Sequence, residues 1–262
     1  MYEWSSSTEG APWKEYCTEI KSVKINNGVT SIGWSAFENC TNLTDITIPD
    51  GITYIGQGAF YECISLKNIE LPDSVTYVGQ IAFAKCESLV DMILPDGVTS
   101  LGWNTFNSCK NLASIKLPNS LTGIPPYLFE NCISLKEIKI PNSVTSIGWS
   151  AFEGCRNLKN IEIPNSVTSI GHRAFRYCTN LTNVGSLEGV TNIEYEAFYG
   201  CAGMDSIHIP SSIALIGESI IASNSEKTEA LEDIKIILET ASEDELAEYV
   251  CVDNEDFHDM NR

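Results

Sequence analysis

Apolar and polar positions alternate in short runs along most of the chain, and the same run returns every 23 residues. In the first complete unit, residues 29–51, Ile46 and Ile48 flank a polar residue, which is the period of a strand with one buried face. The segment 29–32 repeats this alternation and predicts a second short strand. Apolar positions in the segment 36–43 recur every third residue, a spacing typical of a helical or 3₁₀ turn.

Columns of identical residues show that this unit repeats without slipping. Cysteine recurs at intervals of 23 from Cys17 to Cys201, and only Cys251 lies outside the series. Phenylalanine keeps the same interval from Phe37 to Phe198. Self-similarity at this period indicates a solenoid, in which neighbouring units bury each other's apolar faces. The unit reads V-T-x-I-G-x-x-A-F-x-x-C-x-x-L-x-x-I-x-I-P-x-[SG].

The repeat predicts a leucine-rich-repeat solenoid of about ten coils, β-rich, with a parallel β-ladder, short second strands and helical or 3₁₀ turns. We divide the chain into four parts. They are an N-terminal cap with a degenerate first coil (1–28), eight regular 23-residue repeats (29–212), a ninth, irregular repeat (213–241) and an acidic C-terminal cap (242–262). Because both ends look capped, we expect a monomer.

The predicted C-terminal end departs from the strict period. The strand pattern around Ile234 and Ile236 arrives four residues late, so that Ile234 would follow Ile207 in the ladder. Further on, Ser242 and Glu245 form the S-x-x-E pattern of a capping box, which predicts a short helix over the last coil.

Two coils inside the regular array also break the pattern. Pro125–Pro126 stand where other coils have glycine and a variable residue, so we expect no positive φ there. The coil that ends at residues 184–187 lacks both its second inward isoleucine and its proline. A simple local bulge is the expected explanation for both.

Charge narrows the possible partners. The chain carries 35 acidic and 16 basic residues, a formal net charge of −19. Such a surface repels phosphate backbones and anionic headgroups, so we expect no nucleic-acid partner. No apolar run of about 18 residues occurs, so we expect no membrane insertion. Residues 223–262 hold 13 of the acidic residues and only 3 basic ones, as a solvated end cap would.

The repeated pattern resembles the 23-residue leucine-rich repeat of BspA-type bacterial surface proteins, also called the Treponema pallidum-type repeat. The resemblance extends over about residues 11–236 and includes the segment Ala11-Pro12-Trp13. It implies a secreted or surface-attached adhesion module that binds host or bacterial proteins. Since the chain as given shows neither a signal peptide nor a wall anchor, a cytoplasmic location is the alternative.

Few residues suggest chemistry. The cysteine column is compatible with disulfides, a soft-metal site or buried free thiols, and we favour free thiols because every rung must touch an identical rung. The three histidines form no nucleophile–base set and no metal spacing. We therefore expect no enzymatic activity, no metal and no cofactor.

Two surfaces are candidates for binding. Solenoids of this kind commonly bind ligands along the outward residues of the strand ladder, where Ile93 is unusual in being apolar. The second candidate is the row of aromatic residues that follow the repeat glycine, which can anchor a protein or stack on a sugar ring. The ladder candidates are Asp91, Ile93, Lys116, Glu137, Lys139 and Glu162, and the aromatic candidates are Trp34, Trp103, Trp149 and Tyr195.

Three functions follow from these candidates. The first is a non-catalytic protein-binding scaffold at the cell surface or outside the cell. The second is an intracellular protein-interaction module. The third is a carbohydrate-binding module that uses the turn tryptophans.

Overall fold

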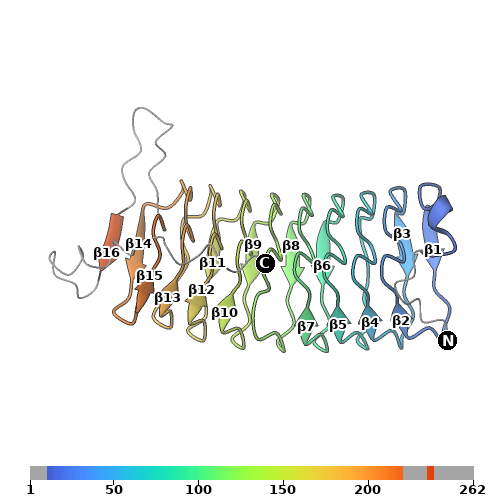
Figure 1. Ribbon diagram of the computed structural model, residues 1–262, viewed down its shortest axis with the longest axis horizontal. Helices are drawn as coiled ribbons and strands as arrows, with labels where there is room; N and C mark the ends of the chain where they lie inside the picture. The colour runs from blue at the N-terminus through green and yellow to red at the C-terminus, as the bar shows by residue number, and fades with distance from the viewer. Residues whose placement is uncertain (1–10, 221–234, 239–262) are drawn as a thin grey trace, which may run out of the picture.

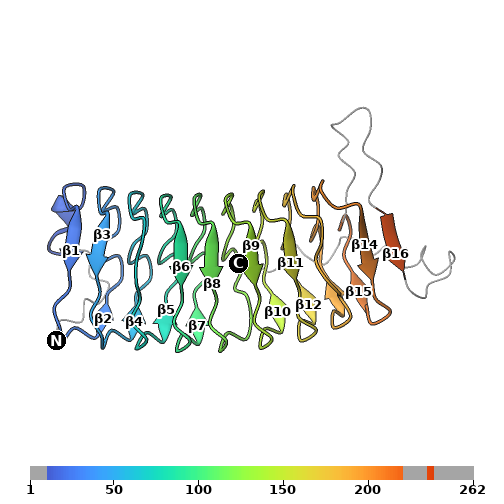
Figure 2. The ribbon, with the colours of Figure 1, turned by 180° about the vertical axis from the view of Figure 1, so that it is seen from behind.

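The computed structural model describes residues 11–220 and the backbone of residues 235–238. The described chain is one rod of stacked coils with two rows of short strands along its length (Figure 1). Seen from behind, the same two rows run the length of the rod (Figure 2). The helix predicted after Ser242 lies outside the described residues. The parallel β-solenoid predicted from the 23-residue period is confirmed.

The first row of strands comes from the L-x-x-I-x-I segment of most coils and forms two-stranded sheets, whereas residues 66–71 and 181–186 form no strand. Its strands pair in parallel and present one buried residue between two exposed ones, as the alternation predicts. The row contains β1 (Ser22–Lys24), β3 (Asp45–Thr47), β6 (Asp91–Ile93), β8 (Ser114–Lys116), β9 (Glu137–Lys139), β11 (Asn160–Glu162), β14 (Ser206–Ile209) and β16 (Lys235–Leu238).

The second row comes from the V-T-x-I segment and forms two separate four-stranded sheets. One sheet orders its strands β2-β4-β5-β7 and the other β10-β12-β13-β15. These strands are β2 (Ser31–Ile32), β4 (Tyr54–Ile55), β5 (Tyr77–Val78), β7 (Ser100–Leu101), β10 (Ser146–Ile147), β12 (Ser169–Ile170), β13 (Asn192–Ile193) and β15 (Leu215–Ile216).

The segments between the strands are tight turns. The three-residue spacing expected there is present, for example where the Cys63 N–H donates to the Phe60 carbonyl at 3.1 Å. Left-handed residues such as Glu62, with φ 61°, interrupt each turn, so the segments do not continue into 3₁₀ helices. Within the described residues, helical structure is limited to the 3₁₀ turn η1 (Lys14–Tyr16).

The core consists of columns of identical side chains. Phenylalanine rings from Phe37 to Phe198 stack with neighbouring centroids 5.2 to 5.8 Å apart, and Trp13 begins the column 5.7 Å from Phe37. Most of these rings have no exposed surface. Burial of each ring contributes roughly 1.5–3 kcal/mol, so the column is a main source of stability. The predicted continuous ladder is confirmed.

The C-terminal register differs from the sequence prediction. Ile207 pairs with Ile236, not with Ile234, and Ile209 pairs with Leu238. The Ile207–Ile236 separation of 29 residues exceeds the 23-residue period by six, not by the four expected. A shift of two residues keeps the same side chains on the same face, so the hydrophobic pattern alone could not distinguish the two registers.

The irregular coil around residue 185 loses its strand. A single bridge joins Asn160 to Asn183, and Gly185 then turns away with φ 72°. Val184 and Leu187 are both buried, so apolar contact with the core is retained without the second inward isoleucine. The Ile161 and Ile163 N–H groups donate to the carbonyls of the adjacent residues Asn183 and Val184 at 3.1 and 3.3 Å, so the pairing is irregular here and the simple bulge stays a prediction.

Candidate binding surfaces

The strand face between β6 and β8 carries the most exposed apolar side chain of the ladder. Ile93 is 66% exposed and lies opposite Lys116 in the parallel register, while Asp91 lies opposite Ser114. The Ser114 hydroxyl donates to the Asp91 carboxylate. Lys116 also lies 3.6 Å from Asp96. Three predicted ladder residues, Asp91, Ile93 and Lys116, are therefore adjacent on one small sheet.

The adjoining strands β9 and β11 carry the other predicted ladder residues. Lys139 lies opposite Glu162, and Glu137 lies opposite Asn160. All of them are exposed, and the register places opposite charges side by side. Exposed pairs of this kind add little to stability, typically up to about 1 kcal/mol, and so are available to a partner.

The aromatic candidates lie apart from this face, each just after a second-row position. Trp103 and Trp149 are 56% and 55% exposed. Trp34 is also exposed, and its Nε1–H donates to the Tyr54 hydroxyl at 3.0 Å. Tyr195 stacks on His172 with 5.2 Å between ring centroids. The structure brings only Trp103 and Trp149 to one common cavity, and it leaves the other two elsewhere on the rod.

Backbone hydrogen bonds close the second row at nearly every coil boundary. In each regular coil, the repeat threonine N–H donates to the threonine carbonyl of the preceding coil, as Thr76 does to Thr53 at 2.9 Å. The residue at the glycine position likewise donates to the preceding isoleucine or valine, as Gly102 does to Val78 at 2.8 Å. These two series bind neighbouring coils together along the rod.

Both series are interrupted at the same place. Between Thr30 and Gly217, the one boundary that lacks the threonine and glycine bonds is the one between residues 98–102 and 121–125. We call this boundary the Pro125 gap. The neighbouring turn is also loosened: the Asn104 N–H reaches the Pro126 carbonyl at 3.2 Å, whereas the equivalent bond of Tyr127 is 2.7 Å.

Pro125 explains the gap. Proline has no N–H, so it cannot donate to the Leu101 carbonyl as glycine does elsewhere. The repeat glycine also sits against the preceding coil: a Cβ on Gly79 would lie 2.6 Å from the Gln57 nitrogen. Pro125 carries a Cβ and a ring at this tight position, so the coils separate on this face. The predicted bulge was therefore wrong, because pairing is lost and no bulge forms.

The left-handed backbone conformation lies two residues after the repeat-glycine position, not at the glycine itself. Tyr127 has φ 59°, and Ser35 in a regular coil has φ 50°. The repeat glycines Gly56 and Gly79 do not have a positive φ. At Gly56 and Gly79 glycine is favoured because neighbouring backbones approach closely, not because φ is positive, whereas Glu194 holds the same position at another closed boundary.

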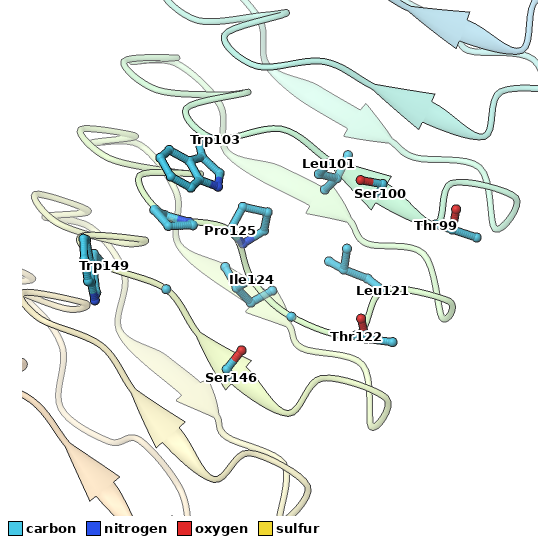
Figure 3. A pocket seen from close by; sticks show the side chains of 13 residues that line it. Thr99, Ser100, Leu101, Trp103, Leu121, Thr122, Ile124, Pro125, Ser146 and Trp149 are labelled. Atoms are coloured by element: carbon cyan, nitrogen blue, oxygen red, sulfur yellow. The ribbon is translucent and has the colours of Figure 1, made fainter.

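A cavity of about 440 Å³ opens at the Pro125 gap. Figure 3 shows Trp103, Pro125 and Trp149 at one end of it and Thr99 and Thr122 at the other. None of its lining residues is charged. Those residues are Thr99, Ser100, Leu101, Trp103, Leu121, Thr122, Gly123, Ile124, Pro125, Pro126, Ser146, Gly148 and Trp149.

The nine cysteines from Cys17 to Cys201 are free and buried. Most of the thiols also donate a hydrogen bond to the preceding coil, as Cys132 does to the Phe106 carbonyl at 3.1 Å. Burial raises the pKa of the Cys201 thiol to about 12. The preference for free thiols over disulfides is confirmed for this column, and the thiols act as protonated donors inside the core.

Charged side chains gather on the turns near the C-terminal half of the rod. Glu196 accepts a hydrogen bond from Arg173 at 2.7 Å, and this contact and the neighbouring Arg176 lower the pKa of the Glu196 carboxyl against the effect of its burial. The Arg176 guanidinium also lies over the Tyr177 ring. Among residues 11–220, no group of three or more His, Cys, Asp and Glu side chains is arranged to hold a metal ion. This cluster therefore acts as an ion-pair network between coils.

In the described ranges no helix has the length and apolar character needed to cross a bilayer.

Stacked coils, parallel ladders and buried columns together define the class of this protein as a leucine-rich-repeat solenoid. Six copies of the BspA-type leucine-rich repeat region match residues 14–127 and 99–228. The chain belongs to this family.

Solved structures agree with this assignment. A leucine-rich repeat protein from Bacteroides ovatus is 27% identical over 85% of this chain and 76% of its own, with a TM-score of 0.52. The leucine-rich repeat protein of T. pallidum is 28% identical over 70% of this chain and 78% of its own, with a TM-score of 0.50. No curated protein matches the chain.

Sequence reasoning found the residues around the Pro125 gap but not the gap itself. Trp103 and Trp149 were candidates because of their type, and Pro125 was recognised as a break in the pattern. The available signal was the loss of one N–H at a position where every other coil uses it as a donor. The open backbone of Leu101 carries no signal of its own, because its side chain fits the repeat.

Proposed function

We propose that this chain is a non-catalytic protein-binding scaffold that acts at the cell surface or outside the cell. Leucine-rich-repeat rods of this family typically serve as protein-interaction modules. The observation that carries the proposal is the exposed strand face, where an apolar side chain, Ile93, stands among the charged residues Asp91 and Lys116. A central apolar anchor surrounded by polar groups is typical of a protein-binding hot spot.

The test is binding of the purified chain to immobilised host extracellular-matrix proteins. We expect Ile93→Ala to weaken capture by about tenfold, the loss of one hot-spot contact. Thr47→Ala is the matched control, because Thr47 holds the same ladder position in β3 and is also exposed. Failure of every matrix and bacterial surface protein to bind would refute the adhesion role.

The family resemblance supports the extracellular location, and the free thiols of the core fit an intracellular role equally well. Cell fractionation with thiol labelling decides between them. Recovery of the chain only in cytosol would select an intracellular interaction module.

Carbohydrate binding is the second candidate, since Trp103 and Trp149 are exposed at an uncharged cavity. Indole rings stack on the apolar faces of sugars, so a bound oligosaccharide would change tryptophan fluorescence. A silent glycan array together with unchanged fluorescence would remove this candidate.

A further inference from the structure

The Pro125 gap leaves a strand edge open in the middle of the rod. The Gly102 N–H donates to the Val78 carbonyl of the preceding coil. Neighbouring residues of a strand point their N–H and carbonyl groups to opposite sides, so those of Leu101 point toward the following coil, at residues 121–125. There it meets Pro125, which has no N–H to offer. In the described part of the chain, neither the N–H nor the carbonyl of Leu101 forms a backbone hydrogen bond across this boundary, and the Thr122 N–H does not donate to the Thr99 carbonyl.

Such groups normally find a partner. Backbone N–H and carbonyl groups are nearly always hydrogen-bonded when shielded from water, and leaving one unpaired costs about 1–3 kcal/mol. Leu101 is only 6% exposed, yet it lines a cavity that is open to the surface. A ligand that supplied an acceptor and a donor at strand spacing would satisfy both groups of Leu101 at once.

The lining indicates the chemistry of that ligand. The segment Thr99 to Trp103 spans about 13 Å at strand rise, enough for about four extended residues. Hydroxyls of Ser100, Thr122 and Ser146 lie along the cavity, and the indoles of Trp103 and Trp149 stand at one end (Figure 3). The lining contains no charged residue, so neither an acidic nor a basic side chain would find an ionic partner in the cavity.

We propose that the Pro125 gap binds an extended, uncharged peptide segment of a partner protein, held by the open backbone edge of Leu101 and by an apolar side chain set against Trp103. This inference rests on the proposed function of the rod as a protein-binding scaffold. A peptide fits better than a sugar, because the free N–H and carbonyl of Leu101 flank a single residue, as in a parallel strand pair.

The experiment selects peptides from a displayed library of random linear sequences against the purified chain. Pro125→Gly restores the repeat residue and its N–H, so it should close the gap and weaken the selected peptides by at least about tenfold. Trp103→Ala should weaken them by a similar factor. Trp34→Ala is the matched control, because Trp34 holds the same repeat position beside a closed boundary, and it should leave binding unchanged.

Three results would overturn the proposal. They are a selection that yields no binding peptide, peptides that bind Pro125→Gly as well as the natural chain, and an oligosaccharide rather than a peptide whose binding Pro125→Gly abolishes. Circular dichroism of each variant confirms that the rod is still folded. If the selected peptides bind Pro125→Gly as well as the natural chain while Ile93→Ala still abolishes capture of matrix proteins, the peptide site is refuted and the scaffold function stands.

Discussion

The boundary at Gly79 and the boundary at Pro125 share the same columns but differ at one backbone nitrogen. At the first, the Gly79 N–H donates to the Ile55 carbonyl at 2.9 Å and the second-row strands pair. At the second, proline offers no N–H and the pairing is lost. Glu194 also replaces the repeat glycine, but it keeps its N–H and its boundary is closed, so the missing N–H is what distinguishes Pro125.

The apolar core is continuous across the Pro125 gap. Phe106 and Phe129 remain stacked across the Pro125 gap at 5.8 Å, compared with 5.2 Å for Phe60 and Phe83 across the closed boundary at Gly79. The Cys132 thiol also crosses the gap with its usual 3.1 Å bond to Phe106. The core therefore continues through the gap, although strand pairing is interrupted in both rows there, since β8 and β9 of the first row are not paired either.

The largest effect is expected when one ring of the aromatic column is removed, either at the Pro125 gap or between two closed boundaries. Phe152 stacks between two rings at 5.4 and 5.2 Å, and Phe152→Ala should cost about 3–5 kcal/mol in the free energy of unfolding by urea. Phe106 borders the gap, and Phe106→Ala should lower the free energy of unfolding nearly as much if the core is continuous. A cost for Phe106→Ala below about half that of Phe152→Ala would show that the gap extends into the core.

A smaller effect is expected from adding a methyl group at a closed boundary. Gly79→Ala places a Cβ 2.6 Å from the Gln57 nitrogen and should destabilise the rod by about 1–3 kcal/mol. Gly33→Ala is the matched control, since the same repeat position in the first regular repeat has no atom within 4 Å of such a Cβ. Denaturant midpoints measure both, and equal midpoints would refute close approach as the reason for glycine.

The pH dependence of stability tests whether the thiol column crosses the gap unchanged. Burial raises the pKa of Cys132 and Cys155 far above the unfolded value of about 9.0. Above that pH the unfolded chain loses these protons while the folded chain keeps them, so stability is complete below pH 9 and falls as the pH rises. Each thiol contributes about 1.4 kcal/mol per pH unit.

Replacing either thiol should make the decline with pH shallower by that amount. Cys132→Ala removes a thiol that spans the gap, and Cys155→Ala removes one at a closed boundary. The free energy of unfolding by urea is measured from about pH 8 to about pH 11, which spans the unfolded pKa of the thiols. The two variants should change its decline with pH equally. A shallower decline only for Cys155→Ala would show that Cys132 is already accessible to solvent.

The sequence predicted the fold well because the fold depends on repetition. A column such as that from Phe37 to Phe198 carries the same information in every coil, so errors at single residues do not matter. The ladder face was predictable for the same reason, since alternation places Ile93 outward. These predictions required only the period of the pattern.

What the sequence could not predict depends on single hydrogen bonds and on contacts between coils. The need for glycine at residue 79 comes from the closeness of the preceding backbone, which no local propensity reports. The pairing of Ile207 with Ile236 depends on which of two equivalent registers the insertion permits. The Pro125 gap combines both effects, because its cause is one missing donor and its result appears in the neighbouring coil.

Amide hydrogen exchange at Leu101 tests the central contrast most directly. In a closed boundary the corresponding N–H, for example that of Val78, is hydrogen-bonded to the next coil and should exchange slowly. We predict that the Leu101 amide exchanges at least about a hundredfold faster than the Val78 amide in the free protein, and that Pro125→Gly brings the two to similar rates. Equal protection of Leu101 and Val78 in the natural chain would contradict an open strand edge at Pro125.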